Sequence, residues 1–221
     1  MWISSAGPEH FLALRRNFMT SHATACIANW VLGIGDRHLS NTLVSLKSGR
    51  TVEVDFSHAF GTATQLQQIP ELVPFRLTPH IISISRPLDE QGPIRKNMER
   101  ALNALRNNSQ TLLATMSVFI FEPSLEWAET GWNPYQKLSL AKSKLEGVSS
   151  AAIMIEELQA RNGDNPELIA KYVDHIKVSV TNCDARKKHP LNVDMQVKSL
   201  IEHATDYNLL GRMYCGWEAW V

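Results

Sequence analysis

The chain has 221 residues, of which 44% are hydrophobic, and its 22 basic and 22 acidic residues give a formal net charge of zero. This length and apolar content suffice for one sizeable core in one or two domains. The balanced charge creates no global field toward nucleic acid or an anionic membrane, so we expect neither to bind this segment directly. Three widely spaced cysteines predict reduced thiols, not a disulfide framework or a zinc site.

The first predicted element is a helix from Pro8 to Leu32. Its second half, continuing to Ile34, is apolar on nearly every side, which indicates that it is buried. This apolar run is interrupted and too short to cross a bilayer, so we expect no membrane span and no signal peptide.

The polar loop after this helix carries the most informative pattern of the chain. Asp36 is followed five residues later by Asn41, and Asp55 ends a later predicted strand. Together an acid, an amide and a second acid can orient a hydroxyl and hold Mg²⁺ against phosphates. We expect Asp36 to accept or orient the proton of a substrate hydroxyl. Asn41 and Asp55 would supply the oxygen ligands that Mg²⁺ prefers.

Two basic residues follow Asp36 in the same loop. His38 can place positive charge or a hydrogen-bond donor beside a γ-phosphate. We expect Arg37 to support the loop and not to take part in the chemistry. His58 is expected to give similar local support after Asp55.

The segment between the amide and the second acid predicts a β-hairpin. Residues 42–46 and 51–54 are rich in β-branched side chains, and the polar turn between them contains a glycine. The hairpin would return Asp55 to the side of Asn41. An acid and an amide at this spacing are common in polar loops, so the spacing alone is weak evidence. Phosphoryl transfer is favoured because the helix end, the polar loop and the hairpin occur together.

The catalytic loop of protein kinases has the order His-Arg-Asp, followed by Asn and later by Asp-Phe-Gly. Here the order is Asp36-Arg37-His38, with the histidine after the acid. This permutation resembles the phosphatidylinositol kinase superfamily, including its large protein kinases, the phosphatidylinositol-3-kinase-related protein kinases. The resemblance continues in three further blocks: Asp55-Phe-Ser-His-Ala-Phe-Gly61, Val73-Pro-Phe-Arg76-Leu-Thr78 and Gly216-Trp-Glu-Ala-Trp220. The last block resembles the FATC tail domain, which closes those kinases.

The resemblance implies a mainly α fold with a small β-hairpin. Residues 1–180 would form the large lobe of a protein-kinase-like fold, with the catalytic loop at 33–41 and the activation segment at 55–78. Residues 190–221 would form a FATC-like tail. No small lobe is expected in this chain, because the residues before the catalytic loop include no glycine-rich loop and no lysine.

The resemblance also implies a function. It implies transfer of the γ-phosphoryl of ATP, with Mg²⁺, to serine or threonine of protein substrates in which glutamine follows the target residue. Asp36 and His38 would be catalytic, and Asn41 and Asp55 would bind the cofactor and the metal. The quoted blocks resemble members that act in DNA double-strand-break repair by non-homologous end joining in the nucleus. DNA-end-binding partner subunits would then act through regions outside this segment.

Two alternatives remain open. Ser57 stands where the family has the glycine of Asp-Phe-Gly, and a side chain there costs about 1–3 kcal/mol if the backbone is strained. With the missing small lobe, this allows a catalytically inactive fragment or scaffold. A phosphoinositide lipid kinase is disfavoured, because Glu71 is the only charged residue between Asp55 and Arg76, whereas anionic head groups need basic side chains.

Beyond the activation segment, apolar residues recur at helical spacing. They predict a helix from Pro93, a break at residues 107–109, a second helix that stops at Pro123, and three further helices, at residues 135–145, 150–160 and 166–176. Residues 177–192 are predicted as a loop and as the boundary between lobe and tail.

The tail is predicted as one helix from Val193 to Leu210, with Asp194 as its N-cap and Gly211 as its stop. An apolar chain end is costly to leave in water. We therefore expect the tail to pack near the activation segment and to keep that segment ordered, through these residues: Leu209, Leu210, Met213, Tyr214, Trp217 and Trp220.

Overall fold

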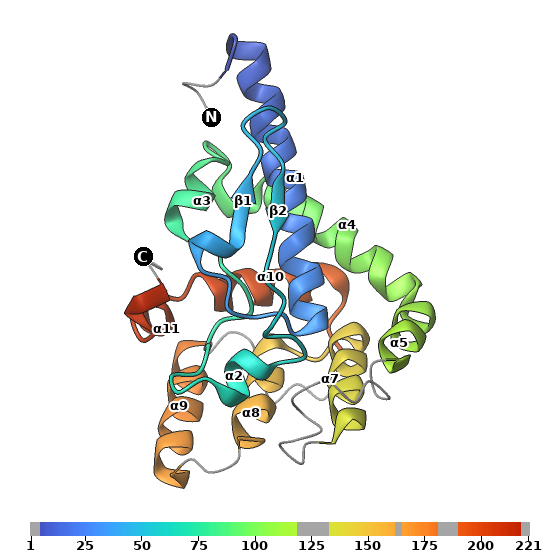
Figure 1. Cartoon of the computed structure of the whole chain (residues 1–221), viewed down its shortest axis with the longest axis vertical. Coiled ribbons are helices and arrows are strands. Elements are labelled where there is room, and N and C mark those ends of the chain that lie inside the picture. The colour runs from blue at the N-terminus through green and yellow to red at the C-terminus, as the bar shows by residue number, and fades with distance from the viewer. Residues whose placement is uncertain (1–4, 119–132, 162–164, 181–189, 218–221) are drawn as a thin grey trace.

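The structure, a computed structural model, describes residues 5–118, 133–161, 165–180 and 190–217. In these ranges the chain is mainly helical and has one two-stranded antiparallel sheet (Figure 1). The predicted fold class is confirmed. Among the described residues, no helix is long and apolar enough to cross a membrane.

The long helix α1 (Pro8–Leu32) is central to the fold (Figure 1). Proline suits its first turn, where the missing N–H would have no partner in any case. The helix ends at Gly33, whose left-handed φ of 66° closes the last turn and whose N–H donates to Trp30 O at 3.2 Å. A Cβ at Gly33 would lie 2.5 Å from Gly61 N, so the chain crosses here at backbone distance.

One core forms where α1 packs against α4 (Pro93–Asn107), which in turn packs against α10 (Val193–Ala204). The predicted burial of the second half of α1 is confirmed, and α4 buries Ile94, Met98 and Leu102 against it. The fully buried side chains of this core include Ala23, Ile27, Ile94, Met98, Leu102, Val197, Leu200 and Ala204.

A second core joins α8 (Ser150–Gln159), α9 (Pro166–Ser179) and the short helix α11 (Tyr207–Leu210). Leu72 and Val73 of the predicted activation segment are buried in the same cluster. The tail therefore shares a core with that segment, as predicted, through Leu209, Leu210 and Met213, whereas Tyr214 is 45% exposed.

The hairpin consists of β1 (Thr42–Val44) and β2 (Thr51–Glu53), with Leu43 opposite Val52. It is confirmed, although each strand is shorter than predicted. The hairpin lies along α1 (Figure 1), where Thr51 N donates to Ser21 Oγ at 2.9 Å.

Shorter elements complete the described fold. Helix α2 (Thr62–Leu66) lies in the predicted activation segment, and α3 (Pro79–Ser83) follows it. Helix α5 (Ser109–Ser117) follows the predicted break after α4, and α7 (Pro134–Glu146) begins after the N-cap Asn133. The predicted continuation of the α5 region to Pro123 lies outside the described residues.

The predicted boundary between the helix at residues 166–176 and the loop after it is wrong. Helix α9 extends to Ser179, three residues beyond Ile176, because Ile176 and Val180 are buried in the second core and Val180 N still donates to Ile176 O at 2.9 Å. The predicted loop therefore begins later, and residues 181–189 lie outside the described ranges.

The tail is two helices and not one. Asp206 interrupts the predicted helix because its carboxylate accepts from Leu209 N at 3.0 Å and caps α11. Asp194 is not the cap of α10. Asn192 has that role, since its side chain accepts from Met195 N at 2.8 Å, while Asp194 pairs with Arg95 at 2.7 Å. The side chains of Trp217 and Trp220 are outside the described part of the tail.

Candidate active site

The loop after α1 is fixed to the start of the activation segment by backbone hydrogen bonds. Gly35 N donates to His58 O at 2.9 Å, and Gly61 N donates to Gly33 O at 2.8 Å. The start of the catalytic-loop backbone, at Gly33 and Gly35, is thus held by residues that follow Asp55.

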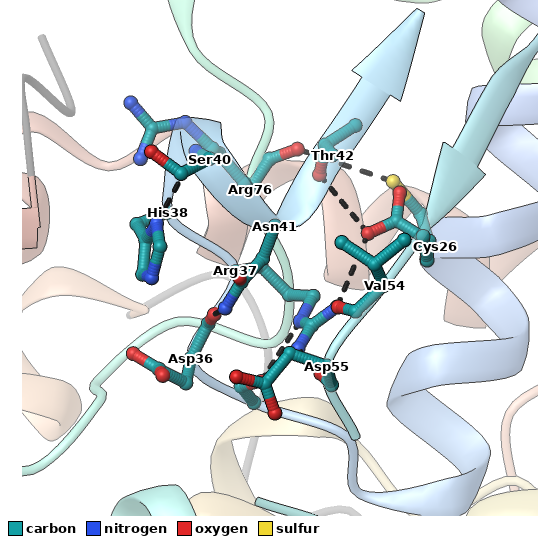
Figure 2. A network of polar contacts seen from close by, with 12 residues as sticks. Cys26, Asp36, Arg37, His38, Ser40, Asn41, Thr42, Val54, Asp55 and Arg76 are labelled. Atoms are coloured by element: carbon teal, nitrogen blue, oxygen red, sulfur yellow. Dashed lines mark hydrogen bonds and ion pairs between the residues drawn. The ribbon is translucent and has the colours of Figure 1, made fainter. Parts of the chain in front are cut away.

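Arg37 makes contacts with several parts of the site (Figure 2). Its side chain is buried, since the residue is only 4% exposed. Its guanidinium donates to the carbonyl oxygens of Gly35, at 2.8 Å, of Val54, at 2.9 Å, and of Asp55. It also pairs with Glu53 at 3.4 Å. One buried cation therefore connects the catalytic loop, β2 and the Asp55 backbone, which confirms its predicted supporting role.

Asp36 has a left-handed φ of 58°, which is uncommon for a residue with a side chain. Its carbonyl oxygen accepts from Asn41 Nδ2 at 2.8 Å, and its N–H donates to Glu71 Oε1 at 2.7 Å. The carboxylate oxygen Oδ1 is buried without a hydrogen-bond partner. Its acceptor capacity is unused in this structure.

Asn41 and Asp55 are brought together by the hairpin, as predicted, since Val54 N donates to Asn41 O at 3.0 Å. Asp55 is exposed, and its Oδ1 accepts from Ser57 N at 3.1 Å. Hydrogen bonding by Ser57, followed by the nearby charges of Arg37 and His58, lowers the pKa of the Asp55 carboxyl. The carboxylate is therefore ionised at neutral pH.

His38 lies in the same loop and is half-buried. Its Nδ1 accepts from Ser40 N at 3.2 Å and caps the 3-10 turn Leu39–Asn41. Among the contacts of the described residues, His38 has none with the side chains of Asp36 or Asp55. The structure thus joins Asp36, Asn41 and Asp55 through one network and places His38 at its edge (Figure 2).

Residues 1–129 match the family model of phosphatidylinositol 3- and 4-kinases, and residues 190–221 match the FATC domain. The chain belongs to the phosphatidylinositol 3- and 4-kinase family. The FATC match places it among the phosphatidylinositol-3-kinase-related protein kinases within that family.

Curated relatives agree with this family assignment. The chain is 42% identical over 242 residues to the DNA-dependent protein kinase catalytic subunit of Gallus gallus and 39% identical over 236 residues to that of Dictyostelium discoideum. It is 29% identical over 232 residues to the serine/threonine-protein kinase TOR2 of Saccharomyces cerevisiae. Each alignment covers 98% of this chain, which spans 6% of the first two relatives and 9% of TOR2.

A solved structure, the FAT and kinase domain of CtTel1, has the same fold with a TM-score of 0.60 and 25% sequence identity. The match covers 95% of this chain and 12% of that one.

The family's glycine after Asp-Phe is replaced here without backbone strain. In residues 55–78, the backbone φ is positive at Asp55, Phe60 and Gly61, and Ser57 is not among these positions. The conditional cost expected for a side chain at Ser57 therefore does not arise.

Sequence reasoning did not find the role of Glu71 in this kinase-family site. The residue is 8% exposed, and its carboxylate contacts the backbone of Asp36. The only available signal was that it is the single charge between Asp55 and Arg76. Nothing in the sequence spacing links it to a loop residue 35 positions earlier.

Proposed function

We propose that this chain carries the catalytic loop, metal ligands and activation segment of a serine/threonine protein kinase that uses ATP and Mg²⁺. The observation that supports this most is the hydrogen-bond network in which Arg37 joins the loop of Asp36 to the Asp55 backbone and Asn41 binds the Asp36 carbonyl oxygen. Residues 1–180 form its large lobe and residues 190–221 its FATC tail in this proposal.

The donor set fits a hard divalent cation. Asp55 offers an exposed, ionised carboxylate. The amide nitrogen of Asn41 is used by Asp36 O, and this orientation leaves the amide oxygen as a metal ligand. When bound, Mg²⁺ would neutralise charge that develops on the transferring phosphoryl group.

The remaining chemistry belongs to the chain itself. Asp36 would orient the serine or threonine hydroxyl and accept its proton as the oxygen bonds to the γ-phosphorus of ATP and ADP leaves, using acceptor capacity that this structure leaves unused. His38 has its Nδ1 engaged by Ser40, so Nε2 is the nitrogen that faces the γ-phosphate in this proposal.

The activation segment supports a protein substrate over a phosphoinositide. Between Asp55 and Arg76 it has no lysine or arginine, and its one acid, Glu71, is buried. A segment of this kind offers neither of these side chains to an anionic lipid head group. We propose substrates in which glutamine follows the phosphorylated serine or threonine.

The cellular role is proposed from the relatives that are named DNA-dependent protein kinase catalytic subunit. It is DNA double-strand-break repair in the nucleus, with DNA-end-binding partners that act through regions outside this segment.

The test uses this chain joined to the upstream small-lobe region of the Gallus gallus relative. Asp36→Asn should lower turnover of a Ser-Gln peptide by about 10²–10⁴-fold while ATP binding persists. Asp55→Asn should also weaken Mg²⁺-dependent ATP binding. Asp174→Asn, at an exposed site on α9, is the matched control. Near-normal turnover in both active-site variants would contradict the assignment.

The same assay separates the alternatives. A scaffold would bind partners but give no turnover in the joined protein, and a lipid kinase would phosphorylate phosphoinositide vesicles in preference to the peptide. The 221 residues alone should give no turnover, because they contain no glycine-rich loop ahead of Asp36 to cover the phosphates.

A further inference from the structure

A buried carboxylate of the activation segment supports the backbone of the catalytic loop. Glu71 Oε1 accepts from Asp36 N at 2.7 Å. The other oxygen lies so near the loop that a Cβ on Gly35 would approach it to 2.5 Å. Glu71 is thus packed directly beneath the Gly35-Asp36 peptide.

The conformation at Asp36 needs this kind of support. A non-glycine residue with φ of 58° is strained and persists only where its surroundings hold it. Asn41 holds the carbonyl side of Asp36, at 2.8 Å, and Arg37 Nε holds the preceding carbonyl, of Gly35, at 2.8 Å. Glu71 is the side chain that holds the N–H side.

An ion pair does not explain why a carboxylate is buried here. Among the ion pairs between described residues, none includes Glu71, and Arg37 instead pairs with Glu53. Burying a carboxylate is costly unless hydrogen bonds compensate. The compensation comes from the loop that carries Asp36.

We propose that Glu71 is a positioning residue, which fixes the backbone of Asp36 so that the Asp36 carboxylate faces the substrate hydroxyl. The catalytic part of this inference rests on the proposed kinase function. The structural part, that Glu71 determines the conformation of Asp36, does not.

Charged groups of three elements lie around Glu71. Asp36 and Arg37 of the catalytic loop act on its carboxylate, while Lys144 of α7 and Glu157 of α8 line a cavity of about 30 Å³ together with Glu71 and pair with each other at 3.4 Å. Burial raises the pKa of the Glu71 carboxyl to about 7, against the lowering effect of the Asp36 backbone hydrogen bond. The NMR signal of the Asp36 amide should therefore change as the Glu71 carboxyl gains or loses its proton near neutral pH.

The structural test is amide NMR on the 221-residue chain. In the wild type, the Asp36 amide should be protected from exchange, and its proton shift should move with a midpoint of about 7. Glu71→Gln keeps an acceptor oxygen of the same reach, so protection should remain within about 3-fold while that titration disappears. Glu71→Ala should lower protection at Asp36 by about tenfold or more, with α4 amides unchanged. Glu156→Gln, on the exposed face of α8, should change neither property.

Either of two results overturns the proposal. One is unchanged exchange at Asp36 in Glu71→Ala, and the other is a titration of the Asp36 amide near pH 7 that persists in Glu71→Gln. If Glu71→Ala does not fold, the titration in the nearly isosteric Glu71→Gln still decides the question.

The catalytic test uses the chain joined to the small-lobe region. Glu71→Ala should lower kcat by about 10²-fold, with KM for ATP little changed, and Glu71→Gln should restore most of the activity. An unchanged kcat in Glu71→Ala, with Asp36→Asn inactive, contradicts the positioning role while the kinase function stands. Full activity in Asp36→Asn instead contradicts the kinase function, and the NMR result then judges Glu71 separately.

Discussion

His203 of the tail helix α10 contacts Leu72 of the activation segment, with Nε2 at 2.8 Å from the Leu72 carbonyl oxygen. The N–H of the same Leu72 contacts Met213 Sδ at 3.4 Å. The tail therefore binds both backbone groups of the residue next to Glu71, whose carboxylate supports Asp36. Tail, activation segment and catalytic loop form one continuous set of contacts.

Acid should weaken this link. His203 is fully buried, and burial lowers its pKa from 6.5 to about 4, which outweighs the opposing hydrogen bond to Leu72. The folded state thus favours the neutral imidazole, so its contribution to stability is complete above pH 6.5 and is lost as pH falls toward 4. We expect this histidine to lower the free energy of unfolding by about 2 kcal/mol between pH 7 and pH 5.

Urea unfolding at the two pH values measures this effect. Glu71 acts in the opposite direction, since its raised pKa makes it favour folding as pH falls, so the comparison is made between variants. In His203→Gln, the free energy of unfolding should fall less between pH 7 and pH 5 than in the wild type. The exposed His80→Gln should show the same fall as the wild type. An equal pH dependence in His203→Gln and the wild type would contradict the prediction.

Removing tail packing should loosen the activation segment. Leu209 is fully buried in the core that contains Leu72 and Val73, so Leu209→Ala should cost about 2–5 kcal/mol. Hydrogen exchange over residues 55–78 should increase along with exchange in the tail, because the two share that core. Leu12→Ala, at a position that is 57% exposed on α1, is the control. Unchanged exchange in 55–78 would leave the tail with a local packing role only.

The sequence predicted those parts of the site that depend on local patterns. The end of the first helix at Leu32, the hairpin that returns Asp55 to Asn41, and the supporting role of Arg37 follow from local signals within about twenty residues. The same local signals favoured Asp194 as a cap, but the carboxylate of Asp194 instead meets Arg95, from a helix 99 positions away. Local propensity cannot rank Asn192 above Asp194 without knowledge of that partner.

Long-range partners also explain what was missed. In the sequence, Glu71 is notable only as the single charged residue between Asp55 and Arg76, and only folding places it under Asp36. The break at Asp206 had a capping residue as its signal, yet the apolar residues on both sides continue the helical spacing and suggested a single helix. Competing local signals of this kind are decided by tertiary packing.

The buried ion pair between α7 and α8 should be sensitive to loss of one partner. Lys144 Nζ lies 3.4 Å from Glu157 Oε1 and donates to Trp30 O at 2.9 Å, with both charged side chains at most 6% exposed. Lys144→Met leaves the Glu157 carboxylate buried without this partner and should cost about 3–5 kcal/mol.

Chemical unfolding with two controls tests this prediction. Lys142→Met, in the exposed Lys142–Glu146 pair on the same helix, should cost less than about 1 kcal/mol. The double variant Lys144→Met/Glu157→Leu should be more stable than Lys144→Met alone, because it removes the uncompensated charge. If the double variant is less stable than Lys144→Met, the cost of Lys144→Met does not come from leaving the Glu157 charge without its partner.

Gly35 should tolerate no side chain, for steric and not conformational reasons. Gly35 is not among the positive-φ glycines, but a Cβ on it would lie 2.3 Å from the Ala63 Cβ and 2.5 Å from Glu71 Oε2. Gly35→Ala must therefore displace α2 or the Glu71 carboxylate, and we expect a loss of about 1–3 kcal/mol in the free energy of unfolding.

The displaced carboxylate should also weaken its hydrogen bond with Asp36 N, so the Asp36 amide should exchange faster than the global loss of stability explains. Gly7→Ala is the matched control, since a Cβ there meets no atom within 4 Å, and it should change stability by less than about 1 kcal/mol. Equal stabilities of Gly35→Ala and Gly7→Ala would mean that the activation segment is not packed against the catalytic loop as the structure shows.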